Sequence, residues 1–192
     1  MNCPSRSSLI LAAIASGCLA GNAIAEKALT ADGKLTYYGD VRLRYEADYD
    51  SARADGTMRD DRHRARIRAR VGLNYELDDH WRAGVRVRTG NHRSQQSSHL
   101  TFKTDDGSHD DLDFVVDKYF LAYRDDHYSA WAGRNSFPFW KQNELFWDDD
   151  VTPTGLAASM TPGGGDVTLT LGGFMLPDGG YQVHQPMVGG QV

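Results

Sequence analysis

The sequence predicts an all-β protein, an antiparallel transmembrane β-barrel; the chain supplies about seven to eight strands of a larger barrel and is therefore expected to be a fragment. Three observations predict this fold. Charged and apolar residues alternate over long segments, short and long connections alternate along the chain, and no run of eighteen apolar residues exists. The clearest alternation covers residues 62–70, where five arginines occupy the even positions. A strand places all five on one face, whereas a helix of about 3.6 residues per turn would spread them around its axis.

Residues 1–25 are expected to be a secretory signal peptide. The apolar run at residues 9–15 and the Ala-Ile-Ala sequence at residues 23–25 fit cleavage before residue 26. Residues 26–192 would then be the N-terminal part of an outer-membrane β-barrel. A second interpretation, lipoprotein cleavage with lipidation at Cys18, remains open. Both cysteines of the sequence lie in this segment, so cleavage before residue 26 would leave a chain without a thiol or a disulfide.

Strands are expected in regular order along the chain. Their approximate ranges are 34–48, 61–77, 81–89, 112–124, 128–134, 156–161 and 167–175, with the beginning of an eighth near 186–192. The first three strands alternate most regularly between charged and apolar residues. In the fourth strand Phe114, Val116 and Phe120 break the alternation, so the sequence leaves its facing open. No segment has the pattern of a helix.

The connections between these strands alternate in length. Long loops are expected at residues 49–60, 90–111 and 135–155, tight turns at 78–80 and 125–127, a glycine-rich turn at 162–165 and a last loop from 177. Outer-membrane barrels have short turns on the periplasmic side and long loops outside. Aromatic residues near the tight turns suit an interfacial belt, although they also suit the core of a soluble sandwich. These residues are Tyr75, Trp81, Tyr123, Tyr128 and Trp131.

The arginine face of residues 62–70 is expected to meet water. At about 2–4 kcal/mol per arginine near the bilayer midplane, five arginines facing lipid would cost on the order of 10–20 kcal/mol. The third long loop is rich in aromatic residues that would be costly to leave in water, so we expect it to fold back and pack against the protein. These aromatic residues are Phe137, Phe139, Trp140, Phe146 and Trp147. Inside a barrel, the loop would bring three aspartates towards the arginines.

Three stretches carry a family resemblance: residues 40–45, residues 132–139, and residues 147–150 with Pro153 and Gly155. Together they resemble the N-terminal half of the putative porin family of the Gram-negative outer membrane. In such porins the third extracellular loop folds into the barrel and narrows the channel, with basic residues on the wall facing acidic residues on the loop.

The resemblance implies a set of site residues. The expected pore-lining basic residues are Arg42, Arg44, Arg62, Arg64, Arg66, Arg68, Arg70, Arg82, Arg86 and Arg88. The expected acidic residues of the constriction loop are Asp148, Asp149 and Asp150. If arginines outnumber acids at the narrowest point, the channel should favour anions.

The chain departs from this family in two respects. Related porins are longer and usually end in an aromatic residue, whereas this sequence ends in Gly-Gly-Gln-Val. Bacterial barrels have at least about eight strands. Seven to eight strands alone would therefore form at most a narrow barrel filled by its own side chains. These departures also predict a truncated product or a fragment.

The expected function is therefore passive diffusion of small hydrophilic solutes or ions through a water-filled channel in the outer membrane of a Gram-negative bacterium. Such a protein is not an enzyme, needs no cofactor, and has membrane lipid and small solutes as its partners; the sequence leaves open whether it forms a homo-oligomer. The alternative is an exported soluble or lipid-anchored β-sandwich that binds a ligand. Fractionation with outer membranes and heat-dependent gel mobility would distinguish the two.

Other classes of site have less support. A calcium site drawn from residues 109–113 or 148–150 lacks the spacing of a dedicated calcium loop, so solvated or pore-facing acids are favoured and no metal is expected. No hydrolase, metalloprotease or phosphate-binding motif is present. A formal net charge of −5 and the neighbouring Asp60 and Asp61 argue against nucleic-acid binding by the arginines.

Overall fold

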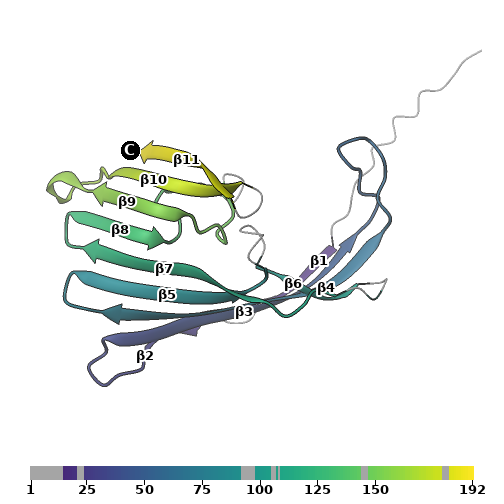
Figure 1. The fold of residues 1–192 in the computed structure, drawn as a ribbon, viewed down its shortest axis with the longest axis horizontal. Helices are drawn as coiled ribbons and strands as arrows, with labels where there is room; N and C mark the ends of the chain where they lie inside the picture. The colour runs from purple at the N-terminus through teal and green to yellow at the C-terminus, as the bar shows by residue number, and fades with distance from the viewer. Residues whose placement is uncertain are drawn as a thin grey trace, which may run out of the picture.

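The chain forms one open antiparallel β-sheet (Figure 1). The computed structural model describes residues 15–20, 24–91, 98–104, 107, 109–143, 147–178 and 182–192. Eleven strands lie in the order β1-β3-β4-β5-β7-β8-β9-β10-β11, with β2 also paired to β3 and β6 to β4. Over these residues the two ends of the sheet are not hydrogen-bonded to each other. In the same part of the chain, no helix has the length and apolar character required to cross a membrane.

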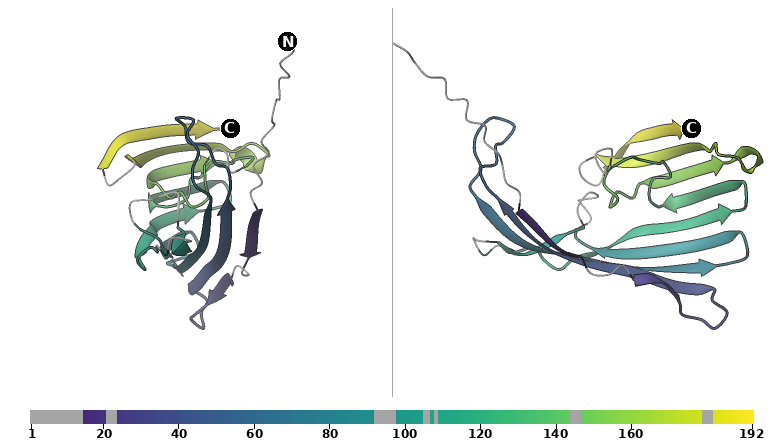
Figure 2. Two further views of the ribbon diagram at one scale, coloured as in Figure 1. Left: turned by 90° about the vertical axis from the view of Figure 1, so that its right-hand side faces the viewer. Right: turned by 180° about the vertical axis from the view of Figure 1, so that it is seen from behind.

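Eight of the strands are the predicted ones, which confirms the all-β antiparallel fold. They are β3 (Leu35–Asp48), β4 (Arg62–Glu76), β5 (Trp81–Thr89), β7 (Phe114–Arg124), β8 (Tyr128–Arg134), β9 (Thr154–Met160), β10 (Leu169–Asp178) and β11 (Gln182–Gln191). The glycine-rich turn is a short 3₁₀ turn, Pro162–Gly164. The strand pairs within the described residues are all antiparallel, and the sheet curves so that β11 and the β3–β4 hairpin stand apart in Figure 1 and in the right-hand view of Figure 2.

Three short strands were not predicted. Strands β1 (Ala15–Ala20) and β2 (Ile24–Ala28) follow one another along the same edge of β3. They fall in or beside the predicted signal peptide, whose residues 1–14 and 21–23 lie outside the described residues; the signal peptide stays a prediction.

Strand β6 (Leu100–Thr104) corrects the expectation of an uninterrupted loop over residues 90–111. It pairs with residues 64–67 of β4. Strand β4 pairs with β5 only over residues 70–76, so β5 leaves the edge of residues 62–69 of β4 unpaired. Backbone N–H and C=O groups at such an edge favour an added strand, and β6 supplies one.

Both short turns are built by the same Asp-Asp-His sequence. Asp78 accepts hydrogen bonds from the backbone N–H groups of His80 and Trp81, each 2.8 Å long. Asp125 accepts the equivalent two hydrogen bonds from the backbone N–H groups of His127 and Tyr128, at 2.8 and 2.7 Å. These backbone hydrogen bonds hold the pKa of both carboxyl groups below the usual range of aspartate. The aspartates therefore stay ionised and fix the geometry of both turns.

The two faces of the sheet differ in chemistry. We call the face that carries the strand arginines the inner face and the opposite face the outer face. The register of β3 and β4 pairs Arg42 with Arg68 and Leu43 with Ile67, so like residues share a face on neighbouring strands. The outer face exposes apolar side chains, with Val71 61% and Leu171 68% accessible. Further exposed apolar residues of this face are Val41, Leu43, Leu73, Val85, Val87, Leu121, Leu156 and Val188.

The buried interior is correspondingly polar. Only four hydrophobic residues are buried in the described chain, among them Phe174 and Leu100, whereas charged and hydroxyl side chains such as Arg88, Asp117 and Thr152 are fully enclosed. A soluble β-sandwich has the opposite arrangement, with an apolar core between two sheets. The single sheet with its exposed apolar face therefore does not have the architecture of a sandwich.

Candidate functional site

The ten predicted arginines all lie on the inner face. They come from three adjacent strands: two from β3, five from β4 and three from β5. The continuous register across these strands brings their even-numbered residues into one array. Five like charges along one strand repel one another, so the array needs acidic partners to be stable.

Strand β3 supplies most of those partners. Its Asp40, Glu46 and Asp48 have the same parity as its arginines and therefore share the inner face. Glu46 lies 2.6 Å from Arg64, and Asp48 lies 2.7 Å from Arg62. These pairs are partly buried, and each acid meets more than one arginine. The acids were visible in the alternation of residues 40–48 but were not predicted as site residues.

Asp117 is a second acid that the sequence analysis missed. The pairing of β5 with β7 shifts register between Arg86 and Val87, which leaves Asp117 as an extra residue in β7. Its side chain is completely buried on the inner face and lies 2.6 Å from Arg86 and 3.8 Å from Arg88. The same bulge explains why the alternation of residues 114–120 was irregular.

Asp150 joins the third long loop to the arginines. Its carboxylate lies 3.1 Å from Arg68 and 2.7 Å from Arg70, and it accepts a hydrogen bond of 2.9 Å from the Ser98 hydroxyl. Burial raises the pKa of this carboxyl group, but the charge of Arg68, the Ser98 hydrogen bond and the charge of Arg70 outweigh burial and leave the pKa below its usual value. Asp150 is therefore an ionised contact between the loop and strand β4.

Asp148 and Asp149 lie elsewhere. Asp148 accepts the backbone N–H of Asp150 at 2.8 Å, and so shapes the turn that presents Asp150. Asp149 is exposed and pairs with Lys141 of its own loop at 2.6 Å. Of the three aspartates expected to face the arginines, the structure brings one to them.

The other side of the loop is held by aromatic packing. Phe174 of β10 is 2% accessible, and its ring centroid lies 5.0 Å from Phe137 and 5.8 Å from Phe139 of the loop. Trp147 lies 5.4 Å from Phe137, and Trp131 of β8 lies 5.9 Å from Phe174. The expectation that the loop folds back therefore agrees with the structure at these residues. Trp140 is exposed, and Phe146 lies outside the described residues.

A comparison with protein families decides the identity of this arrangement. The family described as putative porin matches residues 54–177, which include most of the arginine array, the loop and Phe174. The chain belongs to this porin family. Searches of curated proteins and of solved structures found no match.

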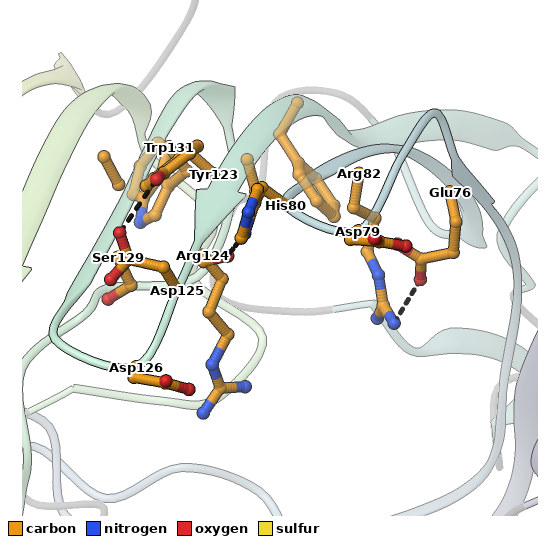
Figure 3. A pocket seen from close by; sticks show the side chains of 13 residues that line it. Glu76, Asp79, His80, Arg82, Tyr123, Arg124, Asp125, Asp126, Ser129 and Trp131 are labelled. Atoms are coloured by element: carbon orange, nitrogen blue, oxygen red, sulfur yellow. Dashed lines mark hydrogen bonds and ion pairs between the residues drawn. The ribbon is translucent and has the colours of Figure 1, made fainter.

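The porin sheet has a hollow at its short-turn end. The hollow has a volume of about 670 Å³, and Figure 3 shows Arg82 directed towards Glu76 on one side and Trp131 and Tyr123 on the other. Acidic side chains outnumber basic ones around it. Its lining residues include Glu76, Asp79, Arg82, Arg124, Asp125 and Asp126. The mouth of the inner face is thus acidic, whereas its middle is rich in arginine.

Aromatic residues of this porin divide between the two faces. Tyr75, Trp81 and Tyr128 are exposed on the outer face near the short turns. Trp81 makes an edge contact with Tyr123, whose hydroxyl donates a hydrogen bond of 2.8 Å to Asp125. Trp131 was expected beside them but packs on the inner face. It lies opposite Ala122 of β7, which in turn lies opposite the inner-face residue Arg82 of β5, and residues paired in this way share a face. Sequence position near a turn did not decide its facing.

Proposed function

We propose that the chain forms one side of a water-filled channel in the outer membrane of a Gram-negative bacterium, through which small hydrophilic solutes or ions diffuse passively. The observation that carries the proposal is the separation of the two faces: charged side chains gather on the inner face and apolar side chains are exposed on the outer face. An outer apolar band and a polar interior are what a membrane-spanning β-sheet requires.

The ion pairs support the same interpretation. Ten arginines could face lipid only at a prohibitive cost, whereas in a lumen they keep water on one side and carboxylates beside them. Among the residues that the structure describes, seven carboxylates lie within ion-pair distance of these arginines. Membership of the porin family agrees with such a wall.

The loop over residues 135–153 would narrow the channel. It is attached to the inner face through Asp150 to β4, through Phe137 and Phe139 to β10, and through two hydrogen bonds between the Trp140 backbone and the Gln191 side chain of β11. A segment held over the middle of a pore wall reduces the cross-section open to solutes. No catalytic step or cofactor is needed for passive diffusion.

Conductance tests the channel. The full chain, refolded into planar lipid bilayers, should give stepwise ion currents that increase linearly with voltage. Liposomes containing it should swell in isosmotic solutions of small sugars but not of large ones. Bilayers that stay electrically silent at a protein density at which a known porin conducts would refute a channel formed by this chain.

Labels on adjacent residues test the facing independently. Spin labels at Thr170→Cys and Leu171→Cys differ by one residue, but Thr170 faces inward and is buried while Leu171 faces outward and is 68% accessible. The label at position 171 should collide with oxygen dissolved in lipid, and the label at 170 should not. Greater collision of the 171 label with a water-soluble nickel chelate would show that the outer face meets water.

A further inference from the structure

One arginine of the inner face differs from the other nine in its partners. Nine of the ten have a carboxylate oxygen within 4.0 Å; Arg42 has none among the residues that the structure describes. It also makes no side-chain hydrogen bond to them. Arg42 is partly exposed and lies near the middle of β3.

The acids around Arg42 are bound by other side chains. Asp40, two residues away on the same face, accepts a bond of 2.7 Å from Arg68 and another from Arg70. Asp150 is taken by the same two arginines and by Ser98. Both oxygens of each carboxylate therefore accept hydrogen bonds from other side chains, and neither carboxylate forms an ion pair with Arg42.

Glu46, further along β3, is also paired with other arginines. Its oxygens bind Arg44, Arg64 and Arg66. The residue directly opposite Arg42 on β4 is Arg68, another cation. Arg42 thus adds a positive charge to a part of the face where every nearby carboxylate is already paired.

An uncompensated guanidinium is available to a passing anion. An anion that approaches a paired arginine must compete with a carboxylate already held in place, whereas at Arg42 it meets free N–H donors with the fork geometry that suits carboxylate and phosphate groups. A fixed charge at mid-height of a water-filled pore also attracts anions and repels cations.

We propose that Arg42 is the residue that sets a preference of this channel for small anions. The proposal rests on the proposed channel function and names the class of solute that it favours. The acidic mouth near Glu76 and Asp126 sits at the end of the sheet and would not determine the choice, because the narrow middle of the path dominates selectivity.

Reversal potentials under a KCl gradient test this proposal. The wild-type chain should be selective for chloride, and Arg42→Gln should lower the chloride-to-potassium permeability ratio by about threefold, as expected for loss of one unit charge close to the ion path. Arg42→Lys should keep most of the preference. The matched control is Arg59→Gln, which removes the same charge from an exposed residue of the long loop.

Each outcome points to a different conclusion. Arg42 has no acidic partner, so its replacement leaves no carboxylate unpaired and the variant should fold; unchanged heat-dependent gel mobility checks this. Wild-type and Arg42→Gln channels with the same permeability ratio would overturn the role of Arg42 and leave the channel intact. An equal loss in Arg59→Gln would show that total charge, not Arg42, sets the preference. Absence of any current would refute a channel formed by this chain, and the role of Arg42 in it.

Discussion

Strands β3–β7 and strands β8–β11 present different chemistry to the loop that lies over them. On the first group the inner face is an array of arginines and carboxylates, and the loop attaches through one ion-paired residue, Asp150. On the second group the inner face carries small residues and the ring of Phe174, and the loop attaches through aromatic contacts and through hydrogen bonds of its Trp140 backbone to the uncharged Gln191 side chain. The same loop is therefore held by charge on one side and by packing on the other.

The difference follows from the side chains that each region carries on its inner face. Charged side chains are long and mutually repulsive, and the β3–β7 region is stabilised by carboxylates that pair with nine of its ten inner-face arginines. Strands β9–β11 have glycine and alanine at inner positions, and a side chain at Gly189 would collide with the Phe139 ring. The small residues leave room for the loop, and the aromatic rings fill that room.

The largest effect should come from the buried acid of the charged region. Asp117→Asn removes the carboxylate that Arg86 and Arg88 share, so the buried guanidinium of Arg86 loses the acid with which it makes its closest ion pair. Breaking a buried pair in this way costs about 3–5 kcal/mol. Urea unfolding in lipid vesicles, followed by tryptophan fluorescence, measures the loss. A change below about 1 kcal/mol, the range of exposed pairs, would show that water reaches Asp117 freely.

The packed region should respond to loss of its central ring. Phe174→Ala removes a ring that is 2% accessible and contacts Phe137, Phe139 and Trp131, so we expect a loss of about 3 kcal/mol. The loop should become sensitive to protease near residue 140, while the ion pairs of β3 and β4 persist. The exposed outer residue Leu171→Ala is the control and should leave the loop resistant. Equal sensitivity of both variants would contradict the packed attachment.

Asp117 and Asp150 mark the limit of what could be predicted from the sequence. The five arginines of residues 62–70 alternate so regularly that the strand and its two faces followed directly, and eight of the strands were predicted. Asp117 could not be placed, because its bulge depends on how β7 pairs with β5. Three consecutive aspartates at 148–150 look equivalent in sequence, and only the turn built by Asp148 selects Asp150 for Arg68 and Arg70. Asp40, Glu46 and Asp48 could have been predicted, since they share parity with the arginines.

Neutralising the ionic contact should release the loop from the charged region alone. Asp150→Asn keeps the shape of the side chain but loses its charge, and Arg68 retains Asp40 as a partner, so the expected cost is about 1–3 kcal/mol. The channel should then conduct more and fluctuate more in planar bilayers. Asp149→Asn, at a residue 68% exposed, is the control and should change neither property.

Acid should produce the same release in the wild-type chain. The pKa of Asp150 lies below its usual value, so the contact is fully formed above the pKa of an unfolded aspartate and is lost as pH falls through the lowered pKa. Current fluctuations should therefore rise only in strongly acidic buffer, and they should be independent of pH in Asp150→Asn. A rise near neutral pH would implicate another group.

The smallest effect should come from His99, beside β6. Burial, with the charges of Arg66, Arg44 and Arg68, lowers its pKa to about 4. Between that value and the usual 6.5, the unfolded chain binds a proton that the folded chain does not, so stability falls as pH falls through this window. We expect a loss of about 1–2 kcal/mol, because His99 keeps some contact with water. His99→Gln should remove this pH dependence of unfolding, while His127→Gln in the exposed turn should retain it; a pH dependence that survives in His99→Gln would assign it to another histidine.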